Sequence, residues 1–253
     1  MSQPRPRRCL VTGGAGGIGE AVARGLGAAG YHVVVTDLDA AKCTEVAEAV
    51  VAAGGSAEGG ALDVTDRAAV EAFFANQDPQ GGIDTLVTSA AIVKAAPILD
   101  FAVEDWARIL EVNLTGTFHC CQVAGRRMAD RGFGRIVTIS SVNGQIANSY
   151  RGAYSCTKAG VDALTRLLAA ELGACRVTAN AVAPTPVDTP MILQVHGPQD
   201  RRRWYDQIPA KRYARPEEVA AAVQFLASEE AGYINGHILN VDGGFMASGI
   251  LLD

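Results

Sequence analysis

Short apolar runs alternate with helix-length segments along the chain, and this alternation constrains the fold more than any other feature. Runs that predict strands occupy residues 8–12, 32–36, 84–88, 135–140, 176–182 and 238–241, and a further run ends at Leu62. Between them lie expected helices at about 17–29, 40–53, 66–76 and 152–173, one or two helices within 101–131, and one that begins at Pro216. Strands and helices in this order predict βαβ units, so we expect an α/β fold with a doubly wound, mostly parallel sheet of about seven strands and helices on both faces.

Composition limits the class of protein further. A length of 253 residues, with no Gly/Ser linker and no repeat, suits one domain, and 49% hydrophobic with 19% charged residues is typical of a globular protein. The net charge of −5 offers no basic stripe for nucleic acid, and no uncharged apolar run is long enough to span a membrane. The basic start, residues 1–8, is followed by too short an apolar run for a secretory signal. Six cysteines without metal-ligand spacing favour reduced thiols in a cytoplasmic protein and predict no metal site.

A glycine-rich turn follows the first expected strand and opens a helix. Its residues 12–19 read Thr-Gly-Gly-Ala-Gly-Gly-Ile-Gly. Glycines allow a tight turn and a close approach to pyrophosphate, and free N–H groups at a helix start favour an anion. The turn therefore predicts a Rossmann-type dinucleotide site, with a plain strand-to-helix turn as the alternative. The candidate cofactor contacts are Gly13, Gly16, Gly17, Ile18 and Gly19.

Asp37 ends the second expected strand, 18 residues after Gly19. A carboxylate there can accept hydrogen bonds from the adenosine ribose hydroxyls. It would repel a 2′-phosphate by roughly 1 kcal/mol per unit charge at contact in water, and several-fold more in a partly dry cleft. We therefore expect NAD(H) rather than NADP(H) as cofactor. The alternative is that Asp37 caps the helix that begins near Ala40.

A tyrosine and a lysine stand four residues apart in the expected helix 152–173, at Tyr154 and Lys158, and so share one helix face. Tyrosine ionises near pH 10, and a nearby ammonium favours its anion. Ser141 lies at the end of the fifth strand, where its hydroxyl could bond a substrate oxygen, and Asn113 is polar inside an otherwise apolar helix. The pair alone is weak evidence, but all four residues together predict a site for proton transfer.

From about residue 8 to residue 245 the chain resembles the short-chain dehydrogenase/reductase family. The resemblance rests on the glycine turn, Asp63-Val64, residues 180–184 and 188–191, the run 215–219 and Val241-Asp242-Gly243-Gly244, together with the four residues above. It implies an oxidoreductase acting on CH–OH groups, with Tyr154 as general acid/base and Ser141 polarising the substrate oxygen. It also implies that Lys158 holds the nicotinamide ribose and lowers the pKa of Tyr154, and that Asn113 anchors a water leading to solvent. Further cofactor contacts implied by it are Asp63, Val64, Ser89, Ala90, Pro184, Val187 and Thr189.

The chain departs from the family pattern at two loops. Alanine stands at Ala91 and threonine at Thr185, where the family usually has glycine. Because alanine takes positive φ less cheaply than glycine, the loop at Ala91 could be set differently. Both changes put the shape of the pocket in question, and neither removes a group that performs chemistry.

The substrate cannot be named from the residues. Asn143 and Gln145 could contact a hydroxyl- or carbonyl-bearing substrate beside Ser141 and Tyr154, and the irregular segment 188–213 is expected to form a lid. The primary hypothesis is interconversion of a secondary alcohol and a ketone with NAD(H). Residues 140–145 also resemble NADPH-type reductases of 3-oxoacyl thioesters, and a non-catalytic dinucleotide sensor or scaffold is a rival from another class. Family resemblance implies a homotetramer or dimer, with the apolar tail 245–252 in the contact.

Overall fold

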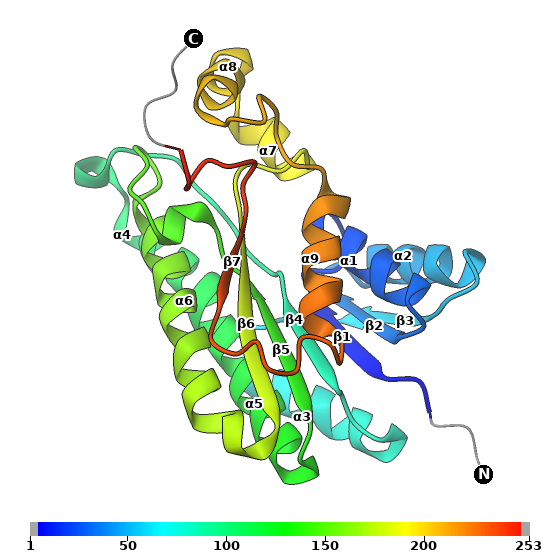
Figure 1. Cartoon of the computed structure of the whole chain (residues 1–253). Coiled ribbons are helices and arrows are strands. Elements are labelled where there is room, and N and C mark those ends of the chain that lie inside the picture. The colour runs from blue at the N-terminus through cyan, green and yellow to red at the C-terminus, as the bar shows by residue number, and fades with distance from the viewer. Residues whose placement is uncertain (1–4, 249–253) are drawn as a thin grey trace.

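A computed structural model of the chain describes residues 5–248 and contains one parallel sheet of seven strands. The sheet order is β3-β2-β1-β4-β5-β6-β7, so the chain starts in the middle and winds outward in both directions (Figure 1). The strands are β1 (Arg8–Thr12), β2 (His32–Asp37), β3 (Ser56–Ala61), β4 (Thr85–Thr88), β5 (Gly134–Ile139), β6 (Val177–Pro184) and β7 (Ile238–Val241). This confirms the predicted doubly wound α/β fold, and every strand ends within two residues of its expected bounds.

Helices cover both faces of the sheet (Figure 1). One face carries α1 (Gly17–Ala28), α2 (Ala40–Ala52) and α9 (Pro216–Ala227), and the other carries α3 (Arg67–Gln77), α5 (Gly116–Arg131) and α6 (Gly152–Leu172). Three short helices, α4 (Val103–Leu110), α7 (Pro190–Val195) and α8 (Pro198–Gln207), complete the set, with the turns η1 (Asp78–Gln80), η2 (Ile98–Asp100), η4 (Val142–Gly144) and η5 (Gly173–Cys175). Within residues 5–248, no helix has both the length and the apolar composition needed to cross a membrane.

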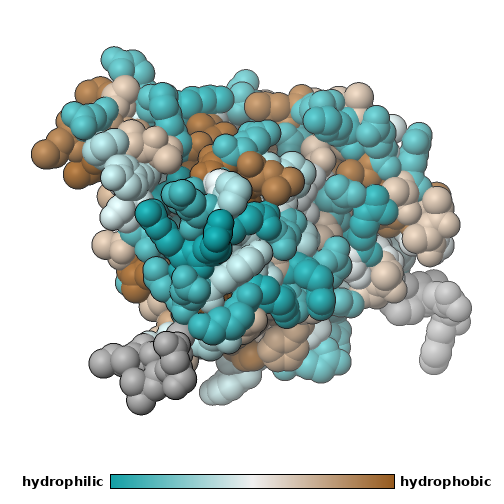
Figure 2. Space-filling model, turned by 90° about the horizontal axis from the view of Figure 1, so that it is seen from above, coloured by the Kyte–Doolittle hydropathy of each residue, from teal (hydrophilic) through white to brown (hydrophobic). Residues whose placement is uncertain are grey.

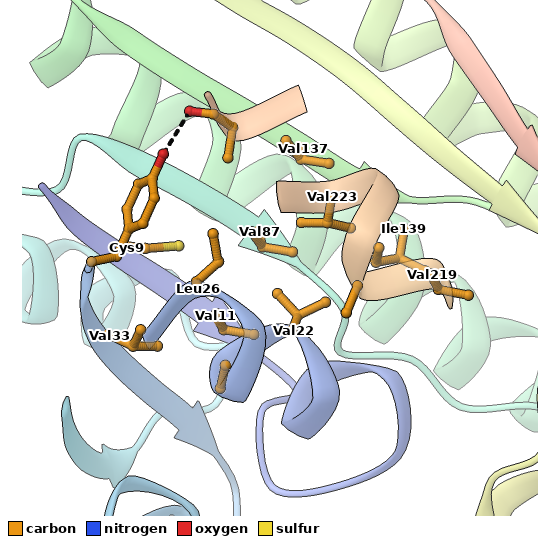
Figure 3. Close-up of a cluster of buried hydrophobic side chains, with 14 of the residues drawn as sticks. Cys9, Val11, Val22, Leu26, Val33, Val87, Val137, Ile139, Val219 and Val223 are labelled. Carbon is orange, nitrogen blue, oxygen red and sulfur yellow. Dashed lines mark hydrogen bonds between the residues drawn. The ribbon is translucent and has the colours of Figure 1, made fainter. Parts of the chain in front are cut away.

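The core between the sheet and the helices α1 and α9 is built from small branched side chains. Figure 3 shows Val22 of α1 and Val219 of α9 packed near the strand residues Val11, Val87 and Ile139. Such side chains suit strands that are covered on both faces, and their burial is the main force that holds the helices on the sheet. A second cluster on the opposite face joins α3 and α5 to the same strands. The central strands are therefore fixed from both sides, which fixes their carboxyl ends.

One element was not predicted. The segment 101–131, expected to hold one or two helices, contains α4 and α5, and the π-helical turn η3 (Glu111–Thr115) that lies between them was not predicted. Such a turn carries one extra residue per turn, so it rotates the side chains that follow it, and it often lies at a functional site. It contains Asn113, which is fully buried.

Candidate active site

A cavity of about 510 Å³ lies beyond the carboxyl ends of the strands. Ligands of open parallel sheets bind at this edge, and this volume is in the usual range for small-molecule sites. Seen from the side on which α7 and α8 lie, the surface mixes polar side chains with apolar patches (Figure 2). The expected residues that line the cavity are Gly13, Gly16, Gly17, Ile18, Asp37, Asp63, Val64, Ser89, Ala90, Ser141, Asn143, Tyr154, Lys158, Pro184, Val187 and Thr189.

The glycine turn packs directly against the end of β4. Gly13 has φ of +66°, and a Cβ there would lie 2.5 Å from the backbone nitrogen of Ala90. Only glycine fits both the dihedral angle and the close approach. Gly19 does not line the cavity, since it packs on the carbonyl of Gly13 instead. The turn therefore brings the start of α1 to the cavity wall without side chains in between, as a phosphate site requires.

Asp37 lies at the wall of the cavity beside this turn. Its carboxylate accepts hydrogen bonds from the backbone nitrogens of Leu38 at 2.7 Å and Ala15 at 3.4 Å. The residue that caps α2 is Asp39, which accepts from the Lys42 nitrogen, so the alternative role of Asp37 as that cap is wrong. Sequence reasoning missed Lys42, which also lines the cavity here and has its Nζ 3.9 Å from Asp39.

Asp63 follows β3 at the same end of the cavity. Hydrogen bonds from the Thr65 hydroxyl and backbone nitrogen lower the pKa of the Asp63 carboxyl, and the charge of Arg108 adds to this. Asp63 is therefore held as an anion at neutral pH. We call the part of the cavity lined by Asp37, Asp39, Lys42, Asp63 and Arg108 the β2–β3 half.

The opposite part of the cavity, lined by Ser141, Arg151, Tyr154, Lys158 and His196, is called the α6 half. Ser141 lies at the end of β5, and its Oγ is 3.4 Å from the Pro184 carbonyl and accepts from Asn143 at 3.2 Å. Burial raises the pKa of Tyr154, while the neighbouring Ser141 hydroxyl and the charge of Arg151 oppose that rise. Arg151, which the sequence did not suggest, is thus one cation whose charge acts on the phenol.

Lys158 is buried, and its Nζ donates to the Ile139 carbonyl at 2.7 Å. The same nitrogen lies 5.5 Å from the centre of the Tyr154 ring. Burial lowers the pKa of Lys158 to about 8, and the carboxylate of Asp162, one turn further along α6, opposes the fall. Asp162 is itself buried, so its pKa is raised.

Asn113 does not line the cavity but joins the two sides of its floor. Its Oδ1 accepts from the Ile92 nitrogen at 2.8 Å, and its Nδ2 donates to the Ile92 carbonyl at 2.9 Å and to Thr157 Oγ1 at 3.3 Å. Ile92 belongs to the loop after β4, and Thr157 precedes Lys158 in α6. The side chain of Asn113 therefore positions the loop after β4 against α6.

The predicted lid segment contributes one wall of the cavity through α7 and α8. Met191, Ile192 and Trp204 line it, whereas Leu193 is 66% exposed and Tyr205 packs on Tyr213. Two lining residues of this segment, Val195 and His196, were not predicted. The hydrophobic pattern of this segment could not show which side chains face the cavity and which face solvent, because prolines interrupt the pattern.

Gln145, which was predicted to contact the substrate, is not among the residues that line the cavity. Its side chain is exposed and bonds Asn240 of β7 at 2.6 Å, outside the cavity. Its partner lies 95 residues away, so no local pattern could reveal this bond. Ala91 lines the cavity without a positive φ, and Thr185 is buried at its wall, so the effect of both departures on the shape of the pocket stays a prediction.

Comparison with known proteins agrees with this geometry. A family model described as enoyl-(acyl carrier protein) reductase matches residues 13–246. A cis-4-hydroxycyclohexanecarboxylate dehydrogenase of Sinomonas cyclohexanicum is 41% identical over 95% of this chain and 97% of its own length. The chain belongs to the short-chain dehydrogenase/reductase family. This confirms the resemblance stated from the sequence and makes the protein an oxidoreductase that acts on CH–OH groups.

Other family members show the range of substrates around this chain. A 3-oxoacyl-[acyl-carrier-protein] reductase of Aquifex aeolicus is 40% identical over 93% of this chain and 95% of its own length. A gluconate 5-dehydrogenase from Burkholderia cenocepacia, solved in complex with NADP and tartrate, has a TM-score of 0.92 at 33% identity and covers 96% of both chains. These relatives share the fold but differ in what they act on, so the substrate must be argued from the site.

Proposed function

We propose that the protein interconverts a secondary alcohol and a ketone by reversible hydride transfer with NAD(H). The observation that carries the proposal is that Ser141, Tyr154 and Lys158 line the same cavity as the glycine turn and Asp37. A proton-transfer group and a dinucleotide cradle in one cavity are what this reaction needs.

The residues present fit a nicotinamide dinucleotide. Gly16 leaves open space where a side chain would stand, and Gly13 lets the turn approach β4, so a pyrophosphate can reach the start of α1. The residues that would hold the cofactor are the glycine turn, Asp37, Asp63 and Val64 at one end, and Lys158, Pro184, Val187 and Thr189 at the other. The nicotinamide supplies or accepts the hydride.

Tyr154 handles the proton. In oxidation the alcohol loses a hydride from carbon and a proton from oxygen, and Tyr154 takes the proton and returns it in the reverse direction. Ser141 holds the substrate oxygen, and Lys158 favours the tyrosine anion when the phenol gives up its proton. Asn113 supports both by fixing the loop after β4 against α6.

The preference for NAD(H) rests on the charge of Asp37. Several solved relatives contain NADP or NADPH, so family membership does not favour NAD(H). In this chain the carboxylate of Asp37 lines the β2–β3 half together with Asp39 and Asp63, which makes that half acidic. A 2′-phosphate would meet this charge. The ammonium of Lys42, near Asp39, and the guanidinium of Arg108, whose charge acts on Asp63, offset only part of it.

A second candidate is reduction of 3-oxoacyl thioesters with NADPH, which the relative from Aquifex aeolicus favours. A steady-state screen of secondary alcohols, ketones and 3-oxoacyl thioesters with both cofactors tests the two functions together. NAD-linked turnover of an alcohol supports the primary proposal, and equal kcat/KM with NADP contradicts the cofactor preference. Turnover confined to thioesters with NADPH would support the second candidate, and cofactor binding without turnover would support a sensor or scaffold.

We also propose that the protein works in the cytoplasm as a homotetramer, with a dimer as the alternative. Large apolar side chains are exposed on the helices that carry the site: Val103 of α4, Phe118 of α5 and Leu167 of α6. Exposed apolar residues gathered on neighbouring helices suit a subunit contact. The apolar tail 245–252 was also expected to lie in a subunit contact, but its residues 249–252 are outside the described residues. Light scattering of the purified protein measures the assembly, and a monomer would contradict it.

A further inference from the structure

Arg151 stands at the start of α6, three residues before Tyr154, and lines the α6 half of the cavity. The backbone of Arg151 also bridges to Ala96 in the loop after β4. Its side chain is half-buried and close enough to Tyr154 for its charge to act on the phenol. Arg151 is therefore a cation placed beside the reacting centre.

One end of the Arg151 guanidinium is held by the lid segment. Its Nη2 lies 2.8 Å from His196 Nε2, and His196 Nδ1 lies 2.8 Å from the Tyr213 hydroxyl. Because arginine can only donate, Nε2 of His196 accepts and its Nδ1 carries the proton. Trp204 stacks on the His196 ring, with an interplanar angle of 18°. The guanidinium is thus oriented by a chain of neutral groups.

The other end of the guanidinium has no partner. Among the described residues that line the cavity, Arg151 alone has a buried side-chain nitrogen or oxygen without a hydrogen bond, and that atom is its Nη1. Within residues 5–248 no carboxylate forms an ion pair with it within 4.0 Å, although the charge of Asp200 acts on it from farther away. By contrast, the buried Arg8 pairs with Glu58 at 2.8 Å, and Arg201 of α8 pairs with Asp188 at 2.9 Å. Arg135 is buried without an ion pair, but it donates to the carbonyls of Gly134 and Ser228. A buried charge normally has a counter-ion or such acceptors, so the unbonded Nη1 of Arg151 points to an anion from outside the chain.

We propose that Arg151 binds a carboxylate of the substrate, so that the alcohol this enzyme oxidises is a hydroxy acid. The inference rests on the proposed function for the identity of the reaction, and it adds the substrate class. A carboxylate matches the fork of a guanidinium, while Met191, Ile192 and Trp204 offer an apolar wall for the carbon skeleton between the acid and the alcohol.

Binding of an acid that cannot react tests the site apart from catalysis. The probe is cyclohexanecarboxylate, titrated by calorimetry into the enzyme saturated with NADH, with its methyl ester as the neutral counterpart. The variants are Arg151→Gln, which removes the charge, and Arg202→Gln as the matched control. Arg202 is an exposed arginine of α8 that does not line the cavity.

We expect saturable binding of the acid to the wild type and to Arg202→Gln, at least tenfold weaker binding to Arg151→Gln, and at least tenfold weaker binding of the ester to the wild type. No binding of the acid to the wild type, or equal binding to wild type and Arg151→Gln, overturns the inference. Circular dichroism and NADH affinity show whether Arg151→Gln is folded. If that variant does not fold, the ratio of acid to ester affinity in the wild type tests the inference instead. A ratio near one overturns it.

Kinetics separates this role from tuning of Tyr154. With 4-hydroxycyclohexanecarboxylate and its methyl ester as substrates, we expect Arg151→Gln to raise KM for the acid at least tenfold and to lower the acid-to-ester ratio of kcat/KM. An equal loss on both substrates means that Arg151 acts through the tyrosine, and overturns the inference. If the acid binds through Arg151 but neither substrate turns over with NAD⁺ or NADP⁺, the proposed function fails while the anion site stands. If the ester turns over as well as the acid, the function stands and the inference fails.

Discussion

The two halves of the cavity differ in charge. The β2–β3 half carries three carboxylates, Asp37, Asp39 and Asp63, and two cations, Lys42 and Arg108, whereas the α6 half carries the cations Lys158 and Arg151 and no acidic lining residue among the residues described. The carboxylates of the first half are solvated or satisfied by backbone nitrogens and hydroxyls. The cations of the second half are buried or half-buried.

This difference suggests that the two ends of one cavity select by opposite charge. Under the proposed function, we expect the acidic half to favour an uncharged ribose over a phosphorylated one, and the basic half to favour a tyrosine anion and an acidic substrate. Since the halves lie on different elements, each can be changed alone. Substitutions in the α6 half should alter turnover, and substitutions in the β2–β3 half should alter which cofactor is used.

The largest effect is expected at Tyr154. We expect Tyr154→Phe to lower kcat roughly a thousandfold, because the ring remains but the group that moves the proton is lost. The dissociation constant for NADH, measured by fluorescence, should change little, since the hydroxyl does not build the glycine turn. A variant that keeps most of its turnover would show that another group transfers the proton.

The next effect concerns the cofactor. Asp37→Asn keeps the shape of the side chain but removes the charge, so the ratio of kcat/KM for NAD to that for NADP should fall about tenfold to a hundredfold. Asp39→Asn is the matched control, because the Asp39 charge is already offset by Lys42. We expect a smaller fall for it. The same ratio in wild type and Asp37→Asn would mean that the acidic half does not select the cofactor.

The sequence predicted the elements of both halves because their signals are local. The unbroken valines at Val33–Val35 mark a strand buried on both faces, and the carboxyl end of that strand places Asp37 at the edge where ligands bind. The spacing of Tyr154 and Lys158 likewise places both on one helix face. The sequence was enough to predict the position of a residue when that position follows from the periodicity of the strand or helix that contains it.

The sequence failed where a partner lies far along the chain. Arg151 bonds His196, which is 45 residues away, and Gln145 turns outward to a partner in β7. The π-helical turn around Asn113 has no pattern of its own, since it depends on the bonds of that side chain to the loop after β4. The charge of the α6 half therefore emerged only when the lid segment was placed against the start of α6.

Replacing a glycine by alanine should destabilise the fold next to the α6 half, where the backbones pack closely, and should be tolerated near the β2–β3 half. A Cβ at Gly144 would lie 2.8 Å from the carbonyl carbon of Lys158, whereas a Cβ at Gly60 of β3 meets nothing within 4 Å. We expect Gly144→Ala to destabilise the fold by about 1 to 3 kcal/mol, because the turn must move away from α6. Gly60→Ala should stay within about 0.5 kcal/mol of the wild type. Urea unfolding at one protein concentration measures both, and equal stabilities would contradict the close approach.

The smallest expected effect tests how the α6 half keeps its charge. Burial lowers the pKa of Lys158 to about 8, and the carboxylate of Asp162 opposes that fall. Asp162→Asn removes the opposing charge, so Lys158 should lose its proton at lower pH. Because the ammonium is proposed to favour the tyrosine anion, we expect the alkaline limb of the kcat/KM profile to move to lower pH, by up to about one unit. Asp130→Asn, an exposed change on α5, should leave the limb in place. A limb that does not move, or that moves to higher pH, would show that the charge of Lys158 is set by groups other than Asp162.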